Sequence, residues 1–309
     1  MTQIIKNIET AVKELLGGSI VALPTETVYG LGANALDADA ALKIFEAKQR
    51  PRFNPLIVHV KNVTDFEKYA EDIPDDVYKL AEKFSPGPIS YIVKKKKIIP
   101  DIITSGSKFV ALRVPSHELF RKVLEESGIP VCAPSANRFS GISPVCAEDV
   151  MKELGGKINY ILDGGKSVLG IESTVVNFTE EGVEILRNGF ITKEEIEKVI
   201  GKTISGFSKK NISPGMLKVH YAPEKPMYFV KSFDEVKHIN DRKIGLLDFS
   251  GYKDSREIAL NLFSDLRNLD EMNIDFIVCK KTEESGLGVA INERLEKAAK
   301  GYLPKELSG

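Results

Sequence analysis

The chain has 309 residues, which is enough for two domains, and its 42% hydrophobic and 28% charged content is ordinary for a globular protein. Lysine and arginine total 43 against 44 aspartate and glutamate residues, so overall charge gives no case for a nucleic-acid-binding protein. Three cysteines without CxxC spacing argue against a disulfide framework and against a structural zinc site. The charged start and the lack of a long apolar run favour a cytoplasmic protein with no membrane association.

The first sixty residues predict a helix followed by a strand–helix–strand unit. Apolar residues at helical spacing predict a helix from Ile8 to Leu16, ended by two glycines. An apolar run at 20–23 predicts a strand, and a polar turn with two glycines follows at 25–32. Asp37 can cap the next helix, which should end near Arg50 because Pro51 disfavours helical geometry before it. The second strand is expected at 56–59, so the pattern is that of a βαβ unit.

The end of that helix carries three cations at alternate positions, Lys48, Arg50 and Arg52. Guanidinium groups match phosphate and carboxylate oxygens, which would suit an anion site. The alternative is a solvated helix end, since cations also suit the C-terminal pole of a helix dipole. The local pattern leaves both readings open.

The middle of the chain predicts helices near 64–70 and 76–84 and strands at 89–93 and 109–114. Four lysines at 94–97 are read as a solvated strand end, with contact to RNA as the minority reading. Arg113 alternates with Leu112 and Val114 in an apolar strand, so its buried charge requires an anion. That anion could be an internal carboxylate or the carboxylate of a ligand.

A loop rich in hydroxyl groups follows the strand predicted at 129–133, which itself follows a helix at 116–126. Further elements are expected at 147–154 (helix), 158–162, 172–176 and 183–187 (strands), and 192–200 (helix). Thr192 and Glu195 have the spacing of a capping box at the last of these. Residues 202–226 have the composition of a linker. From 227 onward strands alternate with helices, which predicts a small three-layer α/β unit with a parallel sheet.

Several motifs in order resemble the YrdC-like threonylcarbamoyl-AMP synthases in their long, two-domain form. They are PTETVYGLG (24–32), KQRPRFNPLIVH (48–59), SANRFSGISP (135–144), ESTVV (172–176), ILRNG (185–189) and PGMLKVHYAP (214–223). The resemblance implies an α/β fold with a twisted open-sheet catalytic domain at 1–201. It also implies a linker at 202–226 that folds over the active site, and a small Rossmann-like domain at 227–309.

The chain departs from the family pattern at several positions. Cys146 stands where threonine is expected, Asn177 where aspartate is expected and Asn188 where proline is expected. Gln49 and Phe53 replace a glycine and a small polar residue, and Phe109 replaces a threonine. The effect of these departures on the loops is left open by the sequence.

The resemblance implies that L-threonine, bicarbonate and ATP react to threonylcarbamoyl-AMP and pyrophosphate. A downstream threonylcarbamoyl transferase complex would use the product to modify transfer RNA next to the anticodon; direct contact with transfer RNA is left open. All reacting groups are anionic, so the protein must supply cations and donors and exclude water. Mg²⁺ would arrive with ATP, and no protein metal site is expected.

Matching the motifs position by position implies a set of site residues. Threonine would contact Thr27, His59, Arg113, Ala133 and Ser173. ATP would contact Lys48, Arg50, Asn54, Phe109, Ser135, Ser143, Arg187 and Tyr221, with Lys48 and Arg50 as the catalytic cations on its phosphates.

Two other functions compete with this reading. A basic concave surface could grip double-stranded RNA without catalysis, although near-zero net charge weighs against it. A related carbamoyl-adenylate enzyme, as in hydrogenase maturation, would need extra regions for which this chain has neither the length nor the cysteines.

Overall fold

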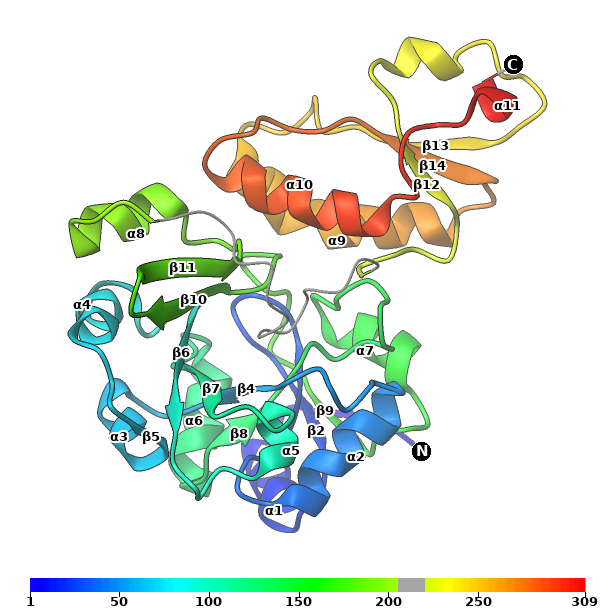
Figure 1. Cartoon of the computed structure of the whole chain (residues 1–309). Coiled ribbons are helices and arrows are strands. Elements are labelled where there is room, and N and C mark those ends of the chain that lie inside the picture. Colours follow the sequence, from blue (N-terminus) through cyan, green and yellow to red (C-terminus); the bar gives the residue numbers. More distant parts are fainter. Residues whose placement is uncertain (205–219, 309) are drawn as a thin grey trace.

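The computed structural model of the chain describes residues 1–204 and 220–308, referred to below as the N-terminal unit and the C-terminal unit. Each unit is built on its own sheet, of eleven and three strands respectively. Figure 1 shows the C-terminal unit standing at one end of the larger N-terminal unit, with two long helices on the side that faces it. No helix within the described residues is long and apolar enough to cross a membrane.

The N-terminal unit holds a mixed, open sheet with helices around it (Figure 1). Its strands are β1 (Gln3–Ile5), β2 (Val21–Leu23), β3 (Gly30–Asn34), β4 (Ile57–His59), β5 (Ala70–Glu71), β6 (Ile89–Lys95), β7 (Phe109–Arg113), β8 (Val131–Cys132), β9 (Tyr160–Leu162), β10 (Thr174–Thr179) and β11 (Gly182–Arg187). They run in the order β1-β9-β2-β3-β8-β4-β7-β6-β10-β11, with β5 paired to β6. The open α/β sheet expected from the family resemblance is therefore confirmed.

With the exception of the short helix at 101–104, which was not predicted, the helices of this unit fall close to the predicted positions. They are α1 (Ile8–Leu16), α2 (Ala38–Lys48), η1 (Val63–Asp65), α3 (Phe66–Tyr69), α4 (Asp75–Phe84), α5 (Asp101–Thr104), α6 (Glu118–Ser127), α7 (Ala147–Leu154) and α8 (Lys193–Ile200). The predicted caps are confirmed: the Asp37 carboxylate accepts hydrogen bonds from the first turn of α2, and Thr192 with Glu195 forms a capping box on α8. Cys146, in the place of the family threonine, begins α7 without a side-chain cap.

The predicted βαβ unit at 20–59 is wrong, because a strand was missed. Residues 30–34 form β3, and both β3 and β8 lie between β2 and β4, each pair running antiparallel. Two glycines normally weaken a strand, which hid β3 in the sequence. Gly32 is required here by close packing: a Cβ would lie 2.8 Å from Leu23 Cδ1 and 2.9 Å from Val131 Cγ1.

The lysine run at the end of β6 is paired with protein carboxylates. Lys94 contacts Glu71 and Asp72, and Lys95 contacts Asp101 at 2.9 Å. The favoured reading, a solvated strand end, fits Lys94, whose side chain is 45% exposed, but not Lys95, whose side chain is 12% exposed.

The C-terminal unit is a small three-stranded parallel sheet with helices, as the alternating pattern predicted. Its elements are β12 (Met227–Phe229), η2 (Phe233–Val236), β13 (Ile244–Leu247), α9 (Ser255–Glu271), β14 (Phe276–Cys279), α10 (Leu287–Ala298) and α11 (Lys305–Ser308). β14 lies in the centre and pairs in parallel with β12 and β13. Helix α9 extends beyond the predicted end near 266 because its next turn is still packed, with Arg267 buried.

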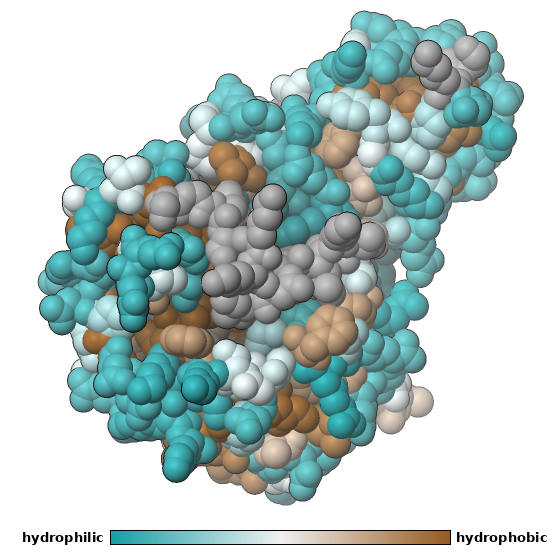
Figure 2. Space-filling model, viewed as in Figure 1, coloured by the Kyte–Doolittle hydropathy of each residue, from teal (hydrophilic) through white to brown (hydrophobic). Residues whose placement is uncertain are grey.

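The two units share one apolar cluster. Val28, Ile142, Val145 and Ile171 of the N-terminal unit pack with side chains of α9 and α10, including Phe263. Gly170 lies so close to α9 that an added Cβ would meet the backbone of Leu260 at 2.5 Å. By contrast, the outer face seen in Figure 2 is mostly hydrophilic over both units. The C-terminal unit therefore packs against the loops that follow β2, β8 and β9.

Candidate active site

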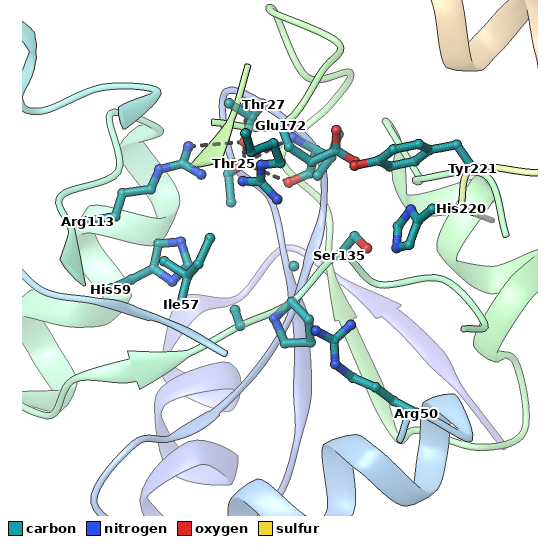
Figure 3. A pocket seen from close by; sticks show the side chains of 15 residues that line it. Thr25, Thr27, Arg50, Ile57, His59, Arg113, Ser135, Glu172, His220 and Tyr221 are labelled. Carbon is teal, nitrogen blue, oxygen red and sulfur yellow. Dashed lines mark hydrogen bonds between the residues drawn. The ribbon is translucent and has the colours of Figure 1, made fainter. Parts of the chain in front are cut away.

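A cleft of about 550 Å³, including the open space at its mouth, lies where the loops after β2, α2, β8 and β9 meet the ends of β4, β7 and β11. Figure 3 shows Arg113 and His59 at one end of it and Arg50, His220 and Tyr221 at the other. The residues that line it are Thr25, Thr27, Val28, Gly30, Arg50, Ile57, His59, Arg113, Ala133, Pro134, Ser135, Glu172, Arg187, His220 and Tyr221. Eight of the thirteen predicted site residues are among them.

At the first end, sheet register places two polar side chains together. His59 on β4 pairs in register with Arg113 on β7, and both are buried. Arg113 Nη2 donates to Glu26 Oε1 at 2.7 Å and to Thr27 Oγ1 at 3.0 Å. The internal carboxylate, one of the two anions considered for Arg113, is thus Glu26, while Arg113 Nε has no hydrogen-bond partner among the described residues.

The His59 ring is held neutral. Burial, followed by the charge of Arg113, lowers its pKa well below the usual value. Its Nδ1 lies 3.3 Å from the carbonyl oxygen of Val131, which can only accept, so Nδ1 carries the proton. The other ring nitrogen is then a hydrogen-bond acceptor beside a cation, an arrangement suited to a ligand with both an ammonium and a carboxylate group.

At the second end, two buried guanidinium groups are held by neutral oxygens. Arg50 donates to the carbonyls of Asn54 and Pro55, and Arg187 donates to the carbonyl and hydroxyl of Ser173. Burial and then the charge of Arg187 lower the pKa of Arg50 to about 9, so it remains a cation at neutral pH. Neither guanidinium group forms an ion pair among the described residues, and the carboxylates of Glu172 and Glu293 act on Arg187 only over a longer distance, so a bound anion is favoured.

His220 and Tyr221 close this end of the cleft. Both are buried, their rings lie 4.1 Å apart between centroids, and Tyr221 adopts a positive φ of 62°. Burial lowers the pKa of His220 to about 3 and raises that of Tyr221, so both side chains are uncharged at neutral pH. The predicted linker lies partly outside the described residues, which resume at His220.

Five predicted site residues do not line this cleft. The Lys48 ammonium is buried and donates to the carbonyl oxygens of Ser135 and Asn137, and burial lowers its pKa. Ser143 donates to Glu172, and Ser173 contacts Ser90 and Arg187. The Asn54 side chain is buried, and Phe109 is 44% exposed at the start of β7. Lys48, Ser143 and Ser173 thus lie directly behind lining residues, and Phe109 lies at the surface.

Glu172 is the main residue that sequence reasoning missed. It lies within the ESTVV motif, but a carboxylate is an unexpected group in a cleft suited to anions. Burial would raise its pKa, yet the charges of Arg294 and Arg187 and the Ser143 hydroxyl lower it overall. His220 was also missed, although the HYAP motif contains it.

Comparisons with known proteins find relatives that match most of the chain. A family model described as Telomere recombination (Sua5, YciO and YrdC) matches residues 13–189, and a model described as Threonylcarbamoyl-AMP synthase, C-terminal domain, matches residues 191–300. The chain is 41% identical to a Threonylcarbamoyl-AMP synthase of Pyrococcus abyssi, over 92% of this chain and 91% of the relative. It is 39% identical to one of Bacillus subtilis, over 92% and 90%. The crystal structure of P. abyssi Sua5 complexed with L-threonine matches with a TM-score of 0.90 and 37% identity, over 98% of this chain and 99% of that chain.

Proposed function

Because the chain belongs to the two-domain threonylcarbamoyl-AMP synthase family and is a nucleotidyl-transferring enzyme, we propose that it makes threonylcarbamoyl-AMP. The substrates are L-threonine, bicarbonate and ATP, and the other products are pyrophosphate and water. The product serves the modification of transfer RNA beside the anticodon, in the cytoplasm, through a downstream threonylcarbamoyl transferase complex. The observation that carries the proposal is a cleft with a cationic group and a neutral histidine at one end and, at the other, two buried arginines that form no ion pair among the described residues.

L-Threonine is assigned to the end formed by His59 and Arg113. Arg113 is already fixed by Glu26, so its remaining N–H groups are oriented toward a ligand carboxylate. Thr27 adds a hydroxyl, and Ala133 lies where β8 ends. Direct contact of threonine with Ser173 stays a prediction from the family resemblance, since the Ser173 hydroxyl accepts from Arg187 at the other end of the cleft.

ATP is assigned to the end formed by Arg50, Arg187 and Tyr221. The two guanidinium groups suit phosphate oxygens, and Tyr221 supplies an aromatic face. Lys48 holds the backbone of the 135–144 loop, which presents Ser135 to the cleft. Direct contacts of ATP with Lys48, Asn54, Ser143 and the main chain of Phe109 stay predictions from the family resemblance.

This arrangement suits a displacement that needs no covalent nucleophile of the enzyme. The amino group of threonine and bicarbonate give a carbamate, and a carbamate oxygen attacks the α-phosphorus while the bond to pyrophosphate breaks. Negative charge develops on pyrophosphate, and buried cations stabilise it more strongly than water would. Closure around the substrates excludes water, which would otherwise hydrolyse the adenylate.

The residues present fit Mg²⁺ only as an ion that ATP brings with it. Residues 1–204 and 220–308 contain no group of three or more His, Cys, Asp or Glu side chains able to hold a metal. The cleft carboxylate Glu172 is already bound by Arg294 and Ser143. Mg²⁺ commonly retains several coordinated water molecules and binds to substrate phosphates. When bound with ATP, it would offset the negative charge of those phosphates.

We further propose that residues 1–201 form the catalytic domain, 202–226 a linker that folds over the site and 227–309 the C-terminal domain. The separate sheets and the division of the two family matches near residue 190 support this arrangement.

The test is pyrophosphate release by the purified full-length protein with ATP, Mg²⁺ and bicarbonate. We expect release to depend on L-threonine and to be much weaker with L-serine or with no amino acid. Pyrophosphate release at the same rate with L-threonine, L-serine or no amino acid would point to a related carbamoyl-adenylate reaction. A folded protein that releases no pyrophosphate but binds double-stranded RNA would favour the RNA-binding alternative.

A further inference from the structure

A buried arginine of the C-terminal unit reaches the wall of the cleft. Arg294 of α10 has an exposed fraction of 0%, and its Nε and Nη2 lie 3.2 and 3.1 Å from Glu172 Oε2. Its Nη1 donates to the carbonyl oxygens of Asn188 and Ala290. The guanidinium carbon also lies 5.7 Å from the centroid of the Tyr221 ring. One side chain of the C-terminal unit thus contacts three parts of the nucleotide end of the site.

The Glu172 carboxylate links Arg294 to the loop that contains Ser143. Its Oε1 accepts a hydrogen bond of 2.6 Å from Ser143 Oγ, while its Oε2 is occupied by Arg294. Without Arg294, the nearest cations that could compensate this carboxylate are those of the cleft itself. Arg187 already acts electrostatically on Glu172, so it would become the main counter-charge and would be less available to a phosphate.

A second contact between α10 and the cleft wall involves Asn188, one of the positions at which this chain departs from the family pattern. Asn188 replaces the family proline, and both its backbone N–H and its side-chain amide donate to Glu293 Oε2, at 3.1 and 3.0 Å. A proline could make neither bond, because it has no N–H and no amide side chain. Glu293 in turn pairs with Lys297 at 2.5 Å and, at the longer distance of 3.8 Å, with Arg294 Nη1.

We propose that Arg294 is a positioning residue for the nucleotide end of the site. It neutralises Glu172, so that this carboxylate orients Ser143 while Arg50 and Arg187 stay free for the phosphates of the nucleotide. The C-terminal unit thereby completes the pocket rather than merely covering it. This inference rests on the proposed function, since it concerns how that site receives ATP.

The competing explanation is that Arg294 only docks the two units together. Arg267 of α9 provides a matched control, because it is another buried arginine of the C-terminal unit. It pairs with Asp149 at 3.3 Å and with Glu153 at 3.0 Å on α7, and donates to the carbonyl of Ile142. Loss of Arg267 weakens the docking of the units without removing the counter-charge of Glu172.

The experiment compares Arg294→Gln, Arg294→Lys, Arg267→Gln, Glu172→Gln and the double variant Arg294→Gln/Glu172→Gln in the full-length protein. Chemical denaturation first establishes that each variant is folded. Mg²⁺–ATP binding by calorimetry and the KM values for ATP and L-threonine are then measured. We expect Arg294→Gln to raise the ATP KM about tenfold with little change for threonine, and Arg294→Lys to lie between it and wild type. Arg267→Gln should lower stability but leave the ATP KM near the wild-type value.

The double variant and the pH profile separate positioning from docking. Removing the Glu172 charge should return the ATP KM of Arg294→Gln to within about threefold of wild type, because the unpaired carboxylate is gone. The groups that act on Glu172 besides Arg294 are Arg187, His220 and the Ser143 hydroxyl. In Arg294→Gln alone, lowering the pH should reduce the ATP KM relative to wild type once Glu172 takes up a proton, and the double variant should not show this change.

Equal increases of the ATP KM in Arg294→Gln and Arg267→Gln, not relieved by Glu172→Gln, would overturn the inference in favour of docking. If Arg294→Gln does not fold, the double variant decides: an ATP KM more than about threefold above wild type would overturn the inference equally. The proposed function is judged separately, on wild type: absence of threonine-dependent pyrophosphate release would contradict that function, while the calorimetric comparison would still decide the role of Arg294.

Discussion

Replacing Arg113 by alanine should cost stability as well as activity. Arg113 and Glu26 are both buried, and the 2.7 Å contact between Nη2 and Oε1 is the only ion pair that Glu26 makes among the described residues. Removing one partner of a buried ion pair costs about 3–5 kcal/mol of unfolding free energy, because the other charge is left uncompensated. Glu26 Oε2 still accepts from the Ser116 N–H at 3.2 Å, which places the expected loss near the lower limit.

The assay is urea denaturation of wild type, Arg113→Ala and the double variant Arg113→Ala/Glu26→Gln at pH 7. We expect Arg113→Ala to lose about 3 kcal/mol and to remain folded, since a typical domain has roughly 5–15 kcal/mol to lose. The double variant should recover part of that loss, because glutamine carries no charge to bury. Neither variant should show threonine-dependent pyrophosphate release.

Two results would refute this reasoning. A loss below about 1 kcal/mol in Arg113→Ala would show that Glu26 does not depend on Arg113. A double variant less stable than Arg113→Ala would show that the carboxylate is compensated in another way.

Three further predictions concern the surroundings of the cleft. Gly189→Ala should lose roughly 1–3 kcal/mol of stability and much of its activity, because the new Cβ would lie 2.5 Å from the carbonyl carbon of Ser173; Gly251→Ala, where a Cβ meets nothing within 4 Å, is the control in the same denaturation assay. In the folded protein the pKa of His220 is about 3, whereas in the unfolded chain it is about 6.5. As the pH drops below about 6.5, only the unfolded chain takes up a proton at this position, so the free energy of unfolding decreases. His220→Asn should remove about 2 kcal/mol of the difference in unfolding free energy between pH 7 and pH 5, and an unchanged difference would contradict this. Lys48→Met should reduce kcat/KM for ATP at least about tenfold, because two carbonyls of the 135–144 loop lose their donor, and wild-type kinetics would argue against that role.

Local sequence patterns predicted those parts of the fold that local interactions determine. The caps of α2 and α8 depend on residues within one turn, and both were predicted from Asp37 and Thr192. Strand β3 was missed because its glycines have low strand propensity, and only contact with Leu23 and the distant Val131 explains them.

The site shows the same limit. Alternation in β7 was enough to predict that Arg113 needs an anion, but it could not identify Glu26, which is 87 residues away in the sequence. Glu172 was harder, because its counter-charge Arg294 lies 122 residues away in another unit. A buried carboxylate in an anion-binding cleft becomes intelligible only once the tertiary fold brings that arginine to it.

The apolar cluster shared by the two units bears on how the protein is made. A ribosome releases Val28, Ile142 and Ile171 well before Phe263 and the rest of α9 and α10 exist to cover them. During that interval the nascent N-terminal unit exposes an apolar surface, which makes it prone to aggregation. It also lacks Arg294, so the nucleotide end of the site is incomplete. Completion of translation then covers the surface and supplies Arg294 in the same folding event.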